Sequence, residues 1–272
     1  MSDSDSDELI SSRLAKAAGA GDLSEIQGLV RNWPSGNAIE KSLQSALYSA
    51  VGQGHVSVIS YLMDLGAKFH ADMAYVALSC KNAEDMFQLG RSRGWDINSR
   101  TTIGLPVFAV VIQSQSLPLT RWFLTHGVDP TLRGSRAGVS GAHMLDVAAA
   151  CSSIEVLDLL IEHGLKLEDS DALHSVASAI DGPPGRLDMM AHLLTLGMDI
   201  NAIEKVGAPE SRGIGRGSPL HSATYLELEE HVAFLLEKGA DPTIKNTLGQ
   251  DVMDFARTQE SWKVVELLSK HS

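Results

Sequence analysis

Three residues of the sequence, Asp146, His174 and His221, have the side-chain types that acid–base chemistry needs. A carboxylate beside an imidazole can fix the tautomer of the ring, and the ring can then exchange a proton near neutral pH. The same residues can equally serve as structural hydrogen-bonding groups. Because neither a nucleophile nor a metal ligand accompanies them, we favour the structural role, and catalysis by these three residues is the alternative.

Motifs that specify catalysis by their spacing do not occur. The chain has no His-Glu-x-x-His, no Cys-x-x-Cys, no phosphate loop ending in Gly-Lys-Ser/Thr, and no Gly-x-Ser-x-Gly. Its two cysteines, Cys80 and Cys151, are too few for a disulfide framework and too far apart for a metal-binding knuckle. We therefore expect no metal and no cofactor, and it stays open whether the protein is an enzyme.

Composition narrows the choice of partners. The 272 residues are 44% hydrophobic, which is enough for a buried core, and the net charge is −12. An acidic surface repels phosphate and anionic lipid, so we expect neither nucleic-acid nor membrane binding. The segment 1–8 is acidic and polar, which predicts a disordered leader and no targeting peptide, and hence a cytoplasmic protein with the nucleus as the alternative.

The elements that position these residues follow from a repeat. An amphipathic run, one or two polar residues and a glycine recur with a period near 33 residues, which indicates a repeat array. Each glycine stands where a helix must end and the backbone must turn left-handed. The six glycines are Gly66, Gly94, Gly127, Gly164, Gly197 and Gly239.

Each repeat is predicted to contain two helices. The helix before the glycine is amphipathic, with Leu157, Leu160 and Ile161 on one face of one example. A shorter helix, rich in small residues such as Ala148 and Ala149, precedes it and permits close packing. A unit of this kind cannot bury its apolar face alone, so the sequence predicts an all-α solenoid of about eight stacked helix pairs with short hairpin connections.

In these features the chain resembles the ankyrin-repeat family. Its best match to the family pattern runs from Ser218-Pro219-Leu220-His221 to Leu235-Leu236-Glu237-Lys238-Gly239-Ala240-Asp241-Pro242. The resemblance implies an ankyrin-repeat domain over residues 9–272, with capping units at about 9–36 and 248–272. The connection 202–221 is similar to insertions common in fungal ankyrin-repeat proteins.

The resemblance also implies roles for single residues. His174 and His221 occupy the family's histidine position, which is a structural hydrogen-bonding post, and Asp146 holds the same position one unit earlier. Other units depart from the pattern: the unit at 73–98 lacks it altogether, and another begins Pro106-Val107-Phe108-Ala109. Such degenerate units change the shape of the groove.

Two functions from different classes follow. The favoured one is a scaffold that binds a protein partner, with basic residues on that partner, in the concave ankyrin groove. The alternative is a cofactor-free cyclase, isomerase or binder of an apolar small molecule, such as an enzyme of secondary metabolism. For either function we expect the binding surface to comprise Tyr48, Tyr75, Phe108, Gln113, Met144, Val147, Cys151 and Tyr225.

Overall fold

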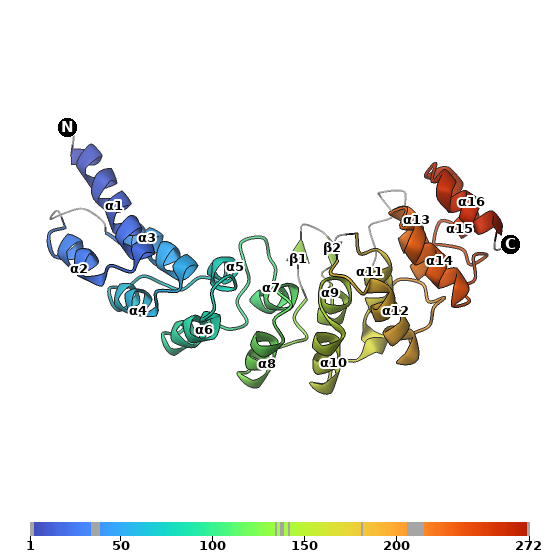
Figure 1. The fold of residues 1–272 in the computed structure, drawn as a ribbon, viewed down its shortest axis with the longest axis horizontal. Helices are drawn as coiled ribbons and strands as arrows, with labels where there is room; N and C mark the ends of the chain where they lie inside the picture. Colours follow the sequence, from blue (N-terminus) through green and yellow to red (C-terminus); the bar gives the residue numbers. More distant parts are fainter. Residues whose placement is uncertain are drawn as a thin grey trace. The chain divides into compact units, whose positions relative to one another are not determined.

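The computed structural model describes residues 3–33, 39–133, 135–136, 139–140, 142–180, 182–205 and 215–270. In this part of the chain the α-helices form eight successive pairs, each an inner helix followed by an outer helix (Figure 1). The predicted helical repeat array is therefore confirmed. The chain divides into two compact units, residues 1–102 and 103–272, which are described separately.

Unit 1 contains three helix pairs. The inner helices α1, α3 and α5 pack side by side in one layer, and the outer helices α4 and α6 contact each other in a second layer. The bounds are α1 Asp3–Ala20, α2 Leu23–Arg31, α3 Glu40–Gln53, α4 Val56–Asp64, α5 Met73–Ala77 and α6 Ala83–Ser92.

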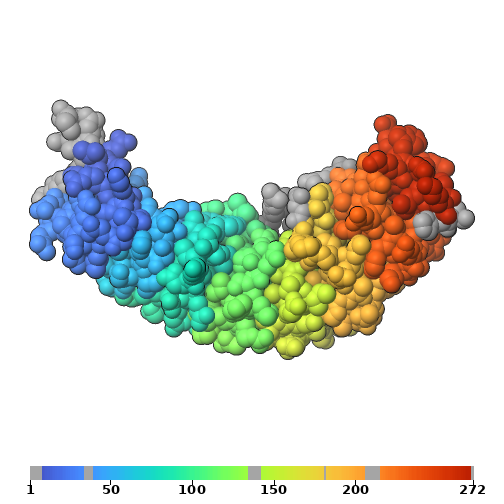
Figure 2. Space-filling model, viewed as in Figure 1, coloured from blue at the N-terminus to red at the C-terminus, as the bar shows by residue number. Residues whose placement is uncertain are grey.

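Unit 2 contains five helix pairs and one short antiparallel ladder, in which β1 Ser135–Arg136 pairs with β2 Val139–Ser140. Helices in contact are near neighbours along the chain, as the succession of colours within the unit shows (Figure 2). The inner helices are α7 Val107–Gln113, α9 Met144–Cys151, α11 Ala172–Ala177, α13 Pro219–Tyr225 and α15 Val252–Thr258. The outer helices are α8 Leu117–Thr125, α10 Ile154–Glu162, α12 Arg186–Thr195, α14 Glu229–Glu237 and α16 Trp262–Lys270, and a 3-10 turn spans Leu167–Asp169.

The two ends of the chain differ from expectation in one respect. Helix pairs stand where capping units were expected, α1 with α2 and α15 with α16. However, α1 begins at Asp3, so residues 3–8 are helical where a disordered leader was expected, and residues 1–2 lie outside the described part. Acidic residues interact favourably with the partial positive charge at the start of a helix, which offsets their low hydrophobicity.

The recurring glycines end the outer helices as predicted. All six have φ between 85° and 102°, a conformation that only glycine adopts without strain. The apolar faces of the helices pack against one another and form the core. In this core, Leu157 and Leu160 of α10 are completely buried. In unit 1, the rings of Phe69, Phe87 and Trp95 pack together with centroids 5.2 to 6.1 Å apart.

Polar side chains at the start of outer helices bind the preceding repeat. Each donates a hydrogen bond to a backbone carbonyl in or just after the previous inner helix, at distances between 2.5 and 3.1 Å. We call these contacts the turn ties. A Cβ atom at Gly54, where φ is 73°, would lie 2.5 Å from Oδ1 of Asn82, so this tie requires a glycine. The donors and acceptors are His55 and Gly19, Asn82 and Gly54, Arg186 and Ala149, and His231 and Ala177.

Replacement of Leu160 by Ala tests the assignment of the core. Because Leu160 is 0% exposed, we expect the cavity left by the substitution to lower the free energy of unfolding by about 2–5 kcal/mol. Urea denaturation followed by circular dichroism measures the change. Leu9→Ala, at a site 56% exposed, is the matched control and should cost under about 1 kcal/mol. An equal loss in both variants would contradict the assigned helix face.

Candidate functional site

The residues singled out for acid–base chemistry bind backbone groups, and each of the three makes at least one such bond to the connection that follows its repeat. Oδ2 of Asp146 accepts a hydrogen bond from the backbone N–H of His143, and Oδ1 accepts one from that of Asp171, both at 2.8 Å. Nε2 of His174 donates to the carbonyl oxygen of Ala202 at 2.9 Å. Both carboxylate oxygens of Asp146 thus accept hydrogen bonds from backbone N–H groups.

His221 makes the same kind of contact one repeat later. Its Nδ1 accepts from the backbone N–H of Ser218 at 3.2 Å, and its Nε2 donates to the carbonyl oxygen of Gln250 at 3.2 Å. A Cβ atom at Gly217 would lie 2.5 Å from Cβ of His221, so the close approach of the chain at this point requires a glycine.

Unit 1 contains an equivalent contact that the sequence reasoning missed. Nε2 of Gln44 donates to the carbonyl oxygen of Lys68 at 2.8 Å, and the N–H of Lys68 donates to Oε1 of Gln44 at 3.0 Å. We call the contacts made by Gln44, Asp146, His174 and His221 the connection ties. The position of Gln44 near the start of an inner helix is the signal that could have identified it.

Burial sets the protonation of these groups. It raises the pKa of Asp146 to about 6, although the two backbone N–H bonds act in the opposite direction. It lowers the pKa of His174 and of His221 below the ordinary value of imidazole. A neutral ring has one donor and one acceptor nitrogen, which is what the bonds of His221 use. In the described part of the chain, Asp146 and His174 form no hydrogen bond with each other, so no acid–base pair is assembled.

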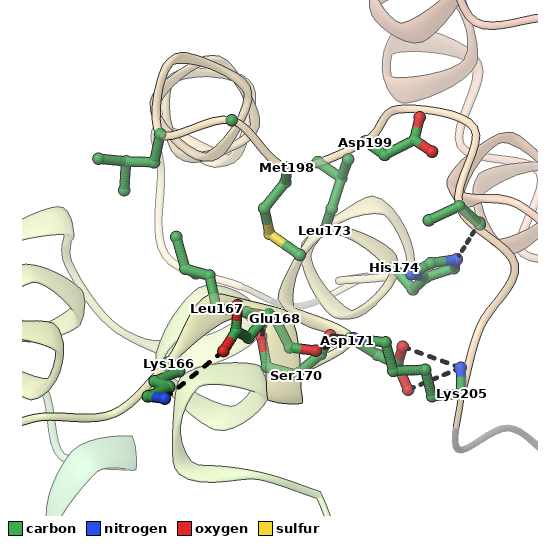
Figure 3. A pocket seen from close by; sticks show the side chains of 13 residues that line it. Lys166, Leu167, Glu168, Ser170, Asp171, Leu173, His174, Met198, Asp199 and Lys205 are labelled. Atoms are coloured by element: carbon green, nitrogen blue, oxygen red, sulfur yellow. Dashed lines mark hydrogen bonds and ion pairs between the residues drawn. The ribbon is translucent and has the colours of Figure 1, made fainter.

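A cavity of about 600 Å³ adjoins His174 in unit 2, between the connections 166–171 and 196–205. Figure 3 shows that its polar side chains point toward neighbouring chain segments. The Asp171 carboxylate accepts from the backbone N–H of Lys205 at 2.9 and 3.1 Å, and Nζ of Lys205 donates to the carbonyl oxygen of Glu168. These contacts join consecutive connections.

The expected wall of a small-molecule cavity is not assembled. Phe108 and Met144 are both 0% exposed, and the Phe108 ring stacks on that of Phe123 with centroids 6.0 Å apart. These two residues belong to the core, which corrects their assignment to a binding surface. Val147 and Cys151 are half-buried in α9, Gln113 is exposed at the end of α7, and Tyr225 is 42% exposed.

Two of the expected binding residues lie near each other in unit 1. Tyr48 of α3 and Tyr75 of α5 are 47% and 41% exposed, and both line a surface depression of about 500 Å³. A second depression, of about 760 Å³, shares Tyr48 and Ser49 with the first. We call these two depressions together the tyrosine surface. It is lined by Ala15, Gly19, Lys41, Gln44, Ser45, Tyr48, Ser49, Gly52, Gln53, His70, Ala71, Asp72, Met73, Tyr75, Val76, Ser79, Arg100 and Thr102.

The sequence reasoning missed the charged end of this surface. Lys41 stands four residues before Ser45 and seven before Tyr48, which is the spacing of neighbours on one helix face. Arg100 and His70 come from the connections after α6 and α4, so only folding brings them to the same depression. The helical spacing of Lys41 could have identified one of the three residues, and nothing local identifies the other two.

Comparisons with known proteins identify one repeat unambiguously. The family model described as the ankyrin repeat matches residues 217–247, which include α13 and α14. Residues 217–247 are therefore an ankyrin repeat. The human ASB11 ankyrin repeat domain, a solved crystal structure, is 19% identical over 93% of this chain and 96% of its own, with a TM-score of 0.45. No curated protein sequence matched the chain.

Within the described residues, no helix combines the length and the apolar character that crossing a bilayer requires.

The raised pKa of Asp146 predicts a change of stability with pH. The folded state keeps this proton up to pH about 6, whereas an unfolded aspartate loses it near pH 4. The folded state therefore binds more protons between these values, and the contribution of Asp146 to the free energy of unfolding falls as the pH rises, by at most about 3 kcal/mol.

Asp146→Asn isolates this contribution, because the titrations of other groups cancel in the difference between the two proteins. We expect the free energy of unfolding of the wild type minus that of the variant to decrease between pH about 4 and about 7. Urea denaturation across this range measures the difference. A constant difference would show that Asp146 keeps its ordinary pKa, and a difference that increases with pH would show that folding lowers its pKa.

Proposed function

We propose that this protein is a scaffold that binds another protein through the exposed side of its inner helices, at the tyrosine surface of unit 1. Ankyrin repeats generally mediate protein–protein binding, and this likeness of fold supports the class of function only. The observation that carries the proposal is the exposure of Tyr48 and Tyr75 beside the shared depressions. Exposed tyrosines on a rigid support are enriched in the centres of interfaces.

The rigidity of the support comes from the residues behind the tyrosines. On the other side of α3, Leu43, Leu47 and Val51 are at most 3% exposed, so the helix is fixed by its core. The connection tie of Gln44 holds α3 to the chain segment that follows α4. A partner would consequently meet a surface that loses little conformational entropy on binding.

The geometry gives no support to the alternative of a cyclase or small-molecule binder. Two of its wall residues, Phe108 and Met144, are core residues, and its polar anchors Asp146, His174 and His221 hold backbone groups.

The charge of the partner depends on the charged residues near the binding surface more than on the net charge of the chain. The net charge of −12 led to an expectation of basic partners, but charges more than about 8–10 Å apart are screened from each other at physiological salt. The charges next to the tyrosine surface therefore decide what binds there. We propose that unit 2 alone prefers partners with basic residues. It contains 22 of the 34 acidic residues and 13 of the 22 basic residues.

Photo-crosslinking tests the scaffold function. A photoreactive amino acid at position 75 should link the full chain to a discrete protein partner in extract of the native cell. The same amino acid at Ser57, an exposed position on the outer helix α4, is the matched control and should not.

Alanine substitutions then measure the contribution of the tyrosines. We expect Tyr48→Ala and Tyr75→Ala each to weaken binding of the captured partner by about tenfold or more, because truncated interface tyrosines commonly cost over 1 kcal/mol. Tyr225→Ala, at an equally exposed site in unit 2, should leave affinity within about twofold. Crosslinking that is equal at positions 57 and 75 would contradict the proposed face.

A further inference from the structure

We infer that the tyrosine surface binds an acidic segment of the partner protein in extended conformation, with an apolar side chain of that segment between Tyr48 and Tyr75. This inference rests on the proposed scaffold function and adds the chemistry of the partner. It is carried by three independent features of the surface, which are its charge, its base and its unused hydrogen-bonding groups.

The charge of the tyrosine surface is opposite to that of the protein as a whole. Its lining contains two cations, Lys41 and Arg100, and one anion, Asp72. Oδ1 of Asp72 already accepts hydrogen bonds from the backbone N–H of Thr102 at 2.9 Å and from its hydroxyl at 3.0 Å. With two cations against one anion, the charge of the lining is positive, which favours the approach of carboxylates.

The charge of the chain is distributed unevenly. Residues 1–102 contain nine basic and 12 acidic residues, whereas residues 103–272 contain 13 basic and 22 acidic ones. Unit 1 is thus less acidic than unit 2 and repels an acidic segment less.

The base of the tyrosine surface lacks a side chain at two positions, because two of the helix residues that line it are glycines. Gly19 of α1 and Gly52 of α3 both line the 500 Å³ depression. A Cβ atom at either position would be 3.7 Å from its nearest neighbour, Ser49 and Val76 respectively, which is an ordinary contact. Packing therefore does not require these glycines, and each costs its helix about 0.5–1 kcal/mol relative to alanine. Their effect is to let a partner's backbone approach closely.

Hydroxyl groups on the surface are available to such a backbone. Within the described part of the chain, the side-chain hydroxyls of Ser45, Tyr48 and Tyr75 have no hydrogen-bond partner. An extended segment has unpaired N–H and C=O groups along its length, and these need partners when the segment is buried. The tyrosine hydroxyls can act as both donors and acceptors, which suits an extended backbone.

A displayed library of random peptides of about 12 residues, selected on the full chain, tests the inference. We expect enriched peptides to carry Asp or Glu next to an apolar residue. The affinity of a fluorescein-labelled enriched peptide, measured by anisotropy, should fall about tenfold or more with Lys41→Glu and with Tyr75→Ala. It should also fall as NaCl is raised from about 50 to about 300 mM.

Matched controls separate these effects from general ones. Lys245→Glu makes the same change in net charge at an exposed site of unit 2, and Tyr225→Ala removes an exposed tyrosine there. Both should leave affinity within about twofold. Lys41, Tyr48 and Tyr75 are exposed, so thermal unfolding of the variants should match that of the wild type, which excludes misfolding as the cause of weaker binding.

Three results would overturn the inference. The first is enrichment of basic or uncharged peptides, and the second is binding that Lys41→Glu does not weaken. The third is tighter binding of single-stranded oligo-dT than of any acidic peptide at the tyrosine surface. Each leaves the scaffold function intact if crosslinking at position 75 still captures a protein partner. Loss of that crosslink as well would refute both proposals.

Discussion

The structure depends on one constraint: no helix pair can bury its apolar face without its neighbours. Two sets of side chains join neighbouring repeats by hydrogen bonds. The turn ties lie at the start of the outer helices, and the connection ties lie near the start of the inner helices. Each tie joins a side chain to the backbone of an adjacent repeat. Apart from the exposed tie of Gln44, these contacts are buried or partly buried, so loss of a tie would leave an unpaired polar group as well as remove a contact.

This constraint explains why Asp146, His174 and His221, whose side chains suit acid–base chemistry, form structural hydrogen bonds instead. Asp146, His174 and His221 are placed where a repeat must hold the next one, and their polar atoms are used for that purpose. Burial lowers the pKa of both imidazoles and so favours the neutral ring, which in His221 supplies one donor and one acceptor and in His174 the donor Nε2. The surface that we propose for binding lies elsewhere, where Tyr48 of α3 and Tyr75 of α5 are exposed.

The exposed side of unit 1 also shows why net charge is a poor guide to a partner. A total of −12 describes the whole chain, while a partner at the tyrosine surface meets mainly Lys41, Arg100 and Asp72. Screening confines electrostatic interactions to about 8–10 Å, so the charged side chains beside the surface affect binding more than the net charge of the whole chain does. The local arrangement of charged residues gives the tyrosine surface a positive charge, whereas the composition of the chain suggests a negative one.

The sequence by itself determined the helical repeats and favoured a structural hydrogen-bonding role for Asp146, His174 and His221, but the tie of Gln44 and the turn ties became visible only in the structure. Helix-ending glycines, amphipathic spacing and the histidine position are local features, so they could be identified without a structure. Whether an aromatic residue of an inner helix is buried or exposed was decided by tertiary structure. Phe108 lies in a seven-residue helix that is apolar on nearly every side, and only stacking decides that it is buried while Tyr48 and Tyr75 are exposed. The meeting of Lys41 with Arg100 likewise depends on connections far apart in sequence, because a surface charge pattern across repeats has no local signal.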